Sequence, residues 1–157
     1  FQEVGMSCDA KKISEKYEDF LGEGHYFIPG AKELLEDLSK KYHLYLASNG
    51  AVKVQMSRIQ SAGIEKYLEK IFLSEQIGYE KPSPQFFEKC FAQIPDFKKE
   101  EALILGDSLT SDIRGGKNAG ILTVWFHPSG KKVEEEIVPD YEIGKLEELK
   151  TILSFYS

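Results

Sequence analysis

The sequence predicts an α/β fold in which a parallel, Rossmann-like sheet is covered by helices on both faces. Short apolar runs alternate along the chain with segments of helical periodicity that are about 10 residues long. The runs are hydrophobic at nearly every position, which is typical of strands buried on both faces of a sheet. Strands that alternate with helices in this way indicate parallel strands joined by helical connections.

Four apolar runs are the predicted strands, and residues that favour turns or helix caps separate them from the helices. The strands are residues 42–47, 71–73, 102–105 and 121–126. Ser83 is a suitable N-cap for one helix, and Pro84 suits its first turn. The other predicted helices are residues 9–21, a segment after Gly30, residues 51–62, residues 110–119 and a last helix with Leu146, Leu149 and Leu153 facing inward.

Composition excludes several classes of function. The chain has 157 residues and a net charge of −6, which argues against binding of nucleic acid. No apolar run approaches the roughly 18 residues that a membrane span needs. Cys8 and Cys90 are the only cysteines and lack the spacing of metal ligands, so we expect reduced thiols and a cytoplasmic location.

Polar side chains follow three of the predicted strands. Ser48 and Asn49 come directly after 42–47, Lys81 lies in the loop after 71–73, and Asp107 and Asp112 follow 102–105. Ligands of open parallel sheets bind beyond the carboxyl ends of the strands. The sequence therefore predicts that these five side chains lie together at one edge of the sheet.

These residue types suit a phosphorylated small molecule and a metal ion. Asp107 and Asp112 offer the hard oxygen ligands that Mg²⁺ takes together with substrate phosphate oxygens. Ser48 can donate a hydrogen bond to a phosphoryl oxygen, and Lys81 can offset developing negative charge. Asn49 either fixes the loop or orients the ligand.

Two consecutive glycines interrupt the predicted helix at 110–119. Each glycine inside a helix costs roughly 0.5 to 1 kcal/mol relative to alanine. Gly115 and Gly116 therefore predict that this helix closely approaches the sheet or another backbone.

The order of these motifs resembles the haloacid dehalogenase (HAD) superfamily of Asp-nucleophile phosphatases. "YLASNG" resembles its second motif, "YEKPSPQFF" its third and "LILGDSLTSDIRGGKNAG" its fourth, and the resemblance extends from residue 26 to residue 153. It implies Ser48, Asn49 and Lys81 at the substrate phosphate, Asp107 as a metal ligand with Asp112 as its acidic companion, and Mg²⁺ as the cofactor. All five residues are then candidate catalytic residues.

A narrower similarity is to the bacterial pyrimidine 5′-nucleotidase-like group. It rests on "IGYEKPSPQFFEKCF", "GDSLTSDIRGG" and "YEIGKLEELKTIL". It implies hydrolysis of nucleoside monophosphates through an aspartyl-phosphate intermediate. The expected partner is therefore a small phosphorylated metabolite, with no role for nucleic acid or membrane.

The sequence departs from the family in its first motif. The family places a D-x-D pair, which holds the nucleophile, after its first strand, and this sequence contains no D-x-D. By the resemblance, residues 1–24 are the end of a helical cap with its hinge, and 25–157 are an incomplete core. The resemblance also implies that the absent first strand lies centrally, between 42–47 and 102–105.

Two buried strand edges would then lack partners, at about 1 to 3 kcal/mol for each unsatisfied backbone group. We therefore expect that this chain does not fold stably alone, that it is inactive alone, and that it needs the missing N-terminal segment of the same enzyme. At the expected hinge, Glu23, His25 and Tyr26 either contact the leaving group or serve the structure.

Several alternatives remain open on the sequence. One is a HAD sugar-phosphate phosphatase or mutase, and another is a dehalogenase, which would not need Mg²⁺. A non-catalytic receiver-like module also gathers acids, a hydroxyl and a lysine at one sheet edge, although its lysine should follow the last strand. A catalytically inactive fragment is the last alternative.

Overall fold

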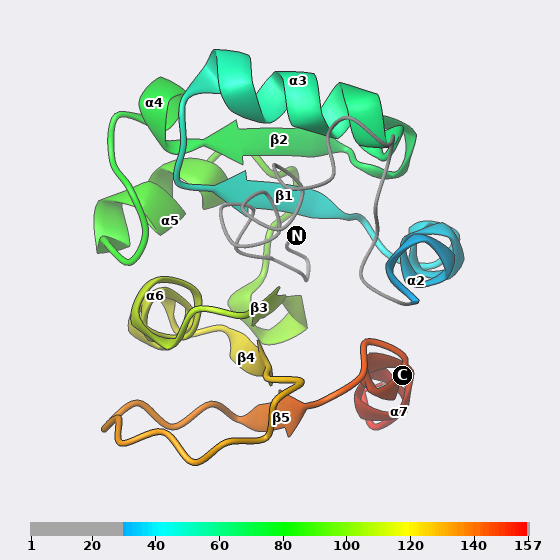
Figure 1. Ribbon diagram of the computed structural model, residues 1–157. Helices are drawn as coiled ribbons and strands as arrows, with labels where there is room; N and C mark the ends of the chain where they lie inside the picture. The colour runs from blue at the N-terminus through cyan, green and yellow to red at the C-terminus, as the bar shows by residue number, and fades with distance from the viewer. Residues whose placement is uncertain (1–29, 157) are drawn as a thin grey trace.

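The computed structural model describes residues 30–156, and Figure 1 shows their arrangement. The parallel strands flanked by helices confirm the predicted fold class. The strands are β1 (Tyr45–Ser48), β2 (Lys70–Leu73), β3 (Leu103–Gly106), β4 (Leu122–Phe126) and β5 (Tyr141–Ile143). The α-helices are α2 (Ala31–Ser39), α3 (Val52–Ala62), α4 (Ser74–Ile77), α5 (Pro84–Phe91), α6 (Arg114–Ala119) and α7 (Glu148–Ser154).

The described strands form two separate parallel sheets. In the first, β1 pairs with β2, so that Ala47 lies opposite Phe72. In the second, β4 pairs with both β3 and β5, and Leu105 lies opposite Val124. Within residues 30–156, β1 and β3 do not pair with each other, as expected if a further strand lies between them. In Figure 1 the strands follow one another from top to bottom in the order β2, β1, β3, β4, β5.

Both faces of the strands are buried, and the side chains alternate between two cores. Leu46 and Leu105 point to a core that they share with α2, α3 and α7. Ala47 and Ile104 point to the opposite core, which includes the buried phenylalanines of α5. Since both cores contain residues of both sheets, apolar packing joins the two sheets even where no backbone pairing does.

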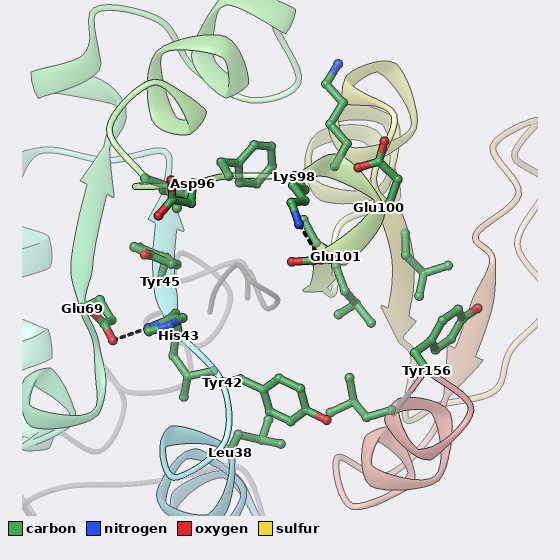
Figure 2. Close-up of a pocket in the computed structure, with 18 of the residues that line it drawn as sticks. Leu38, Tyr42, His43, Tyr45, Glu69, Asp96, Lys98, Glu100, Glu101 and Tyr156 are labelled. Atoms are coloured by element: carbon green, nitrogen blue, oxygen red, sulfur yellow. Dashed lines mark hydrogen bonds and ion pairs between the residues drawn. The ribbon is translucent and has the colours of Figure 1, made fainter.

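A cavity of about 1020 Å³ opens at the amino ends of the strands (Figure 2). One wall contains Leu44 and Tyr45 at the start of β1, and another contains Ala102 and Leu103 at the start of β3. Polar pairs lie around it, including His43 Nδ1 with Glu69 Oε1 at 2.6 Å and Lys98 Nζ with Glu101 Oε1 at 3.3 Å. The two sheets therefore separate at this edge.

Several expectations concern residues outside the described range. The helix at 9–21, the connector, Cys8 and the hinge residues Glu23, His25 and Tyr26 all lie there, so the proposed domain boundary stays a prediction. Cys90 is buried among the phenylalanines of the second core. None of the helices in residues 30–156 has the length and apolarity to cross a membrane.

Candidate functional site

Ser48 ends β1 and is buried at the carboxyl edge of the strands. Ser48 is 1% exposed, and its Oγ has no hydrogen-bond partner among the described residues. Leaving a buried hydroxyl unpaired costs roughly 1 to 3 kcal/mol. Such a group in a folded protein calls for an explanation, and a bound ligand is one.

Asn49 follows Ser48 and binds the backbone of Lys81. Its side-chain Nδ2 donates to the Lys81 carbonyl at 2.9 Å, and its Oδ1 accepts the Lys81 N–H at 2.8 Å. The two residues are 32 positions apart. One side-chain amide thus fixes the point at which the loop after α4 passes the end of β1.

Lys81 places its ammonium group between the two sheets. The residue is 3% exposed, and Nζ donates to the carbonyl of Ala47 in β1 at 3.0 Å. It also donates to Asp112 Oδ1 at 2.5 Å. A buried charge needs such a partner, because desolvation otherwise costs several kcal/mol. The peptide bond between Lys81 and Pro82 is cis.

Asp112 is completely buried beside the end of β3. Its Oδ1 accepts from Lys81, and its Oδ2 accepts the Ser108 N–H at 3.2 Å. A Cβ atom on Gly106 would lie 2.3 Å from the Asp112 side chain. Only glycine therefore allows this carboxylate to pack against the last residue of β3.

A wide helical turn brings Asp112 into this position. The expected helix at 110–119 is replaced by a π-helical turn, Leu109–Ile113, followed by α6. The Ser108 carbonyl accepts from both Asp112 N, at 3.0 Å, and Ile113 N, at 3.1 Å. Single π-turns of this kind occur frequently at functional sites.

Asp107 directly follows β3 and is half-buried. Its carbonyl accepts a hydrogen bond from Trp125 Nε1 at 3.1 Å. The Trp125 ring stacks on His127, with the ring centroids 4.0 Å apart. Trp125 and His127 were not among the predicted site residues. They lie at the carboxyl end of β4, and the position of a polar or aromatic residue at the end of a strand is the signal that located Ser48 and Asp107.

The glycine pair confirms the predicted close approach of α6. A Cβ on Gly116 would lie 2.5 Å from Ile104 Cγ2 and 2.7 Å from Thr123 Cγ2, which belong to β3 and β4. A Cβ on Gly115 would lie 2.4 Å from Phe87 in α5. The helix therefore sits directly on the sheet and beside α5.

Hydrogen bonds link three of the five predicted site residues, Asn49, Lys81 and Asp112. Asn49 and Asp112 both bind Lys81, and Ser48 lies between Asn49 and the Ala47 carbonyl that Lys81 also binds. Asp107 stands next to Gly106, against which Asp112 packs. Residues 30–156 contain no group of three or more histidine, cysteine, aspartate or glutamate side chains arranged to hold a metal. The metal and phosphate roles thus stay predictions.

Known proteins resemble the chain over most of its length. The family of haloacid dehalogenase-like hydrolases matches residues 1–126. The HAD-hydrolase YfnB of Bacillus subtilis is 42% identical over 153 residues, which are 98% of this chain and 65% of that protein. The pyrimidine 5′-nucleotidase PynA of Streptococcus pneumoniae is 37% identical, over 95% of this chain and 63% of that protein.

Solved structures give the same result. A crystal structure of Bacillus subtilis YfnB bound to magnesium superposes with a TM-score of 0.81 at 45% identity, over 88% of this chain and 61% of that one. The chain spans slightly less than two thirds of the length of these relatives. The family match and these similarities establish that the chain belongs to the haloacid dehalogenase-like hydrolases.

Proposed function

We propose that the full-length protein is a Mg²⁺-dependent phosphomonoester hydrolase that acts on nucleoside monophosphates. The observation that carries the proposal is the buried Ser48 Oγ, which lacks a hydrogen-bond partner among the described residues and follows Ala47, whose carbonyl binds the ammonium of Lys81. The similarity to PynA, a pyrimidine 5′-nucleotidase, supports a nucleotide as the substrate. The nucleophilic aspartate would come from a D-x-D segment outside these 157 residues and would form an aspartyl-phosphate.

In this proposal Ser48 and Lys81 bind the phosphoryl group. The Ser48 hydroxyl donates to one of its oxygens and thereby gains the partner it lacks among the described residues. The Lys81 ammonium is buried, and in such surroundings its field on the developing negative charge is stronger than in water. Two hydrogen bonds already hold the Lys81 ammonium in place.

The carboxylates at the end of β3 take different tasks. Asp107 is half-buried and provides the hard oxygen that Mg²⁺ prefers, and the ion would supply positive charge to the phosphoryl oxygens. Both oxygens of Asp112 already accept hydrogen bonds from Lys81 and Ser108. We therefore assign Asp112 the task of holding Lys81, while metal ligation by Asp112 stays a prediction.

Phosphate release by the full-length protein tests this function. Asp107→Asn should lower turnover of nucleoside monophosphates in Mg²⁺ by about 100-fold or more, because a charged metal ligand is lost. Asp96→Asn is the matched control, since Asp96 is exposed in the loop before β3 at the other edge of the strands. EDTA should abolish turnover of the unchanged protein.

Two results would contradict the proposal. Normal turnover by Asp107→Asn at ordinary Mg²⁺ would remove the metal role of Asp107. Turnover of a 2-haloacid that survives EDTA, without release of phosphate from any nucleotide or sugar phosphate, would favour a dehalogenase instead.

A further inference from the structure

We infer that Asn49 is a positioning residue that sets the lysine of the site, rather than a residue that contacts the substrate. The inference rests on the proposed phosphatase function and assigns a task within it. Asn49 acts through Lys81, whose backbone it binds with both ends of its amide. The sequence left two roles open for Asn49, and the geometry favours the fixing of the loop.

The direction of both hydrogen bonds fixes the Asn49 amide. Nδ2 faces a carbonyl and Oδ1 faces an N–H, at 2.9 and 2.8 Å. Turning the amide over would place a donor against a donor and an acceptor against an acceptor. The side chain thus has one favourable orientation, and the Lys81 backbone is held in one place.

The ammonium group of a lysine is well placed only if the backbone that carries the side chain is held in position. The four-carbon stem of the side chain is flexible, so the charged group at its end is poorly placed unless both ends are held. Here Asn49 holds the backbone, while Ala47 O and Asp112 Oδ1 hold the ammonium. Lys81 is therefore fixed from both ends.

Three consecutive residues at the end of β1, Ala47, Ser48 and Asn49, position Lys81 relative to the Ser48 hydroxyl. The carbonyl of Ala47 binds the head of Lys81, the side chain of Asn49 binds its backbone, and Ser48 lies between them with its Oγ unpartnered among the described residues. This arrangement sets the ammonium of Lys81 relative to the hydroxyl of Ser48. Without the Asn49 amide, the Lys81 ammonium would shift relative to the Ser48 hydroxyl, and these are the two donors of the proposed phosphate site.

A double-mutant cycle in the full-length protein tests the inference. Asn49→Ala should lower kcat by about 10- to 100-fold with little change in KM, since a displacement near 1 Å has such an effect on a catalytic group. In a Lys81→Ala background the same change should cost less than about 3-fold, because residues that act as a unit are not additive. An equal loss in both backgrounds, or a loss that falls mainly on KM, would overturn the inference.

A second measurement does not depend on activity. Hydrogen exchange at the Lys81 amide should accelerate in Asn49→Ala, because its acceptor is gone, and stay unchanged in Asn118→Ala. Asn118 is the only other asparagine of the chain and is exposed on α6. Unchanged protection in Asn49→Ala would overturn the inference, even if no form of the protein released phosphate.

Asn49→Asp provides the same cycle if the alanine variant does not fold. It keeps the acceptor for the Lys81 N–H but turns a carboxylate oxygen toward the Lys81 carbonyl. We expect lower kcat that again disappears in the Lys81→Ala background. Loss of the same size in both backgrounds would count against the inference for this variant too.

Discussion

The two edges of the strands differ in how β1 and β3 are joined. At the carboxyl edge the buried ammonium of Lys81 binds Ala47 at the end of β1 and Asp112 after the end of β3. At the amino edge the same two strands begin on either side of a cavity of about 1020 Å³. The strands do not pair with each other anywhere in the described residues.

The difference shows that the site residues also have a structural task. Buried polar contacts between the two sheets occur at the carboxyl edge. There, a polar or charged group left without its partner lowers the free energy of unfolding substantially. The polar pairs of the amino edge are exposed and screened by solvent, so each contributes little. Substitutions at the two edges should therefore differ widely in their effect on stability.

The largest effect is expected from removing the partner of Lys81. Asp112→Ala would leave a buried, uncompensated ammonium group and should lower the free energy of unfolding by about 3 to 5 kcal/mol. Denaturant unfolding of the full-length protein, followed by circular dichroism, measures this loss.

Replacing both charges separates the ion pair from simple loss of volume. Lys81→Met combined with Asp112→Ala should recover much of the stability, since no buried charge is left. A double variant as unstable as the sum of its parts would show that the pair does not act as a unit.

A medium effect is expected at the amino edge from Asp140. Its carboxylate accepts from Lys117 Nζ at 2.6 Å and from Thr123 N and Oγ1 at 2.8 and 2.9 Å. Asp140→Asn should lower the free energy of unfolding by about 1 kcal/mol at neutral pH, a value reduced by the exposure of the ion pair. Denaturant unfolding compares the two forms.

The pH dependence of this difference has a definite sign. Burial raises the pKa of Asp140, but the hydrogen bonds from Lys117 and Thr123 outweigh it and hold the pKa below the ordinary 3.8. The carboxylate therefore stabilises the fold above pH 3.8, and this contribution is lost as the pH falls through the lowered pKa. A difference that grows on acidification would contradict this assignment.

The smallest effect is expected for the His43–Glu69 pair beside the cavity. Its side chains are 76% and 51% exposed. Glu69→Gln should change the free energy of unfolding by no more than about 0.5 kcal/mol. A loss as large as that of Asp112→Ala would remove the contrast between the two edges.

The sequence predicted the position of the site better than its contacts. Ser48, Lys81 and Asp112 could be placed at one edge because the carboxyl ends of parallel strands meet there. That Asn49 binds the backbone of Lys81 was not predictable, because it depends on the path of the loop between α4 and α5. The role of Trp125 toward Asp107 depends in the same way on the side-by-side placement of β3 and β4.

Strand β5 and the π-helical turn are among the elements that escaped prediction, because tertiary contacts define them. Strand β5 has only three residues, of which Ile143 alone is buried, so its sequence lacks a strand pattern and its pairing with β4 creates it. The π-helical turn before α6 follows from the two hydrogen bonds that the Ser108 carbonyl accepts. Helical periodicity alone does not distinguish such a turn from an α-helix.

A crystal structure of the full-length protein with Mg²⁺ and orthovanadate, a mimic of the phosphoryl group, tests the central claim most directly. We predict vanadate oxygens within hydrogen-bond distance of Ser48 Oγ and Lys81 Nζ, with Mg²⁺ bound to the Asp107 carboxylate. Vanadate bound elsewhere, with the Ser48 hydroxyl still unpartnered, would contradict the account.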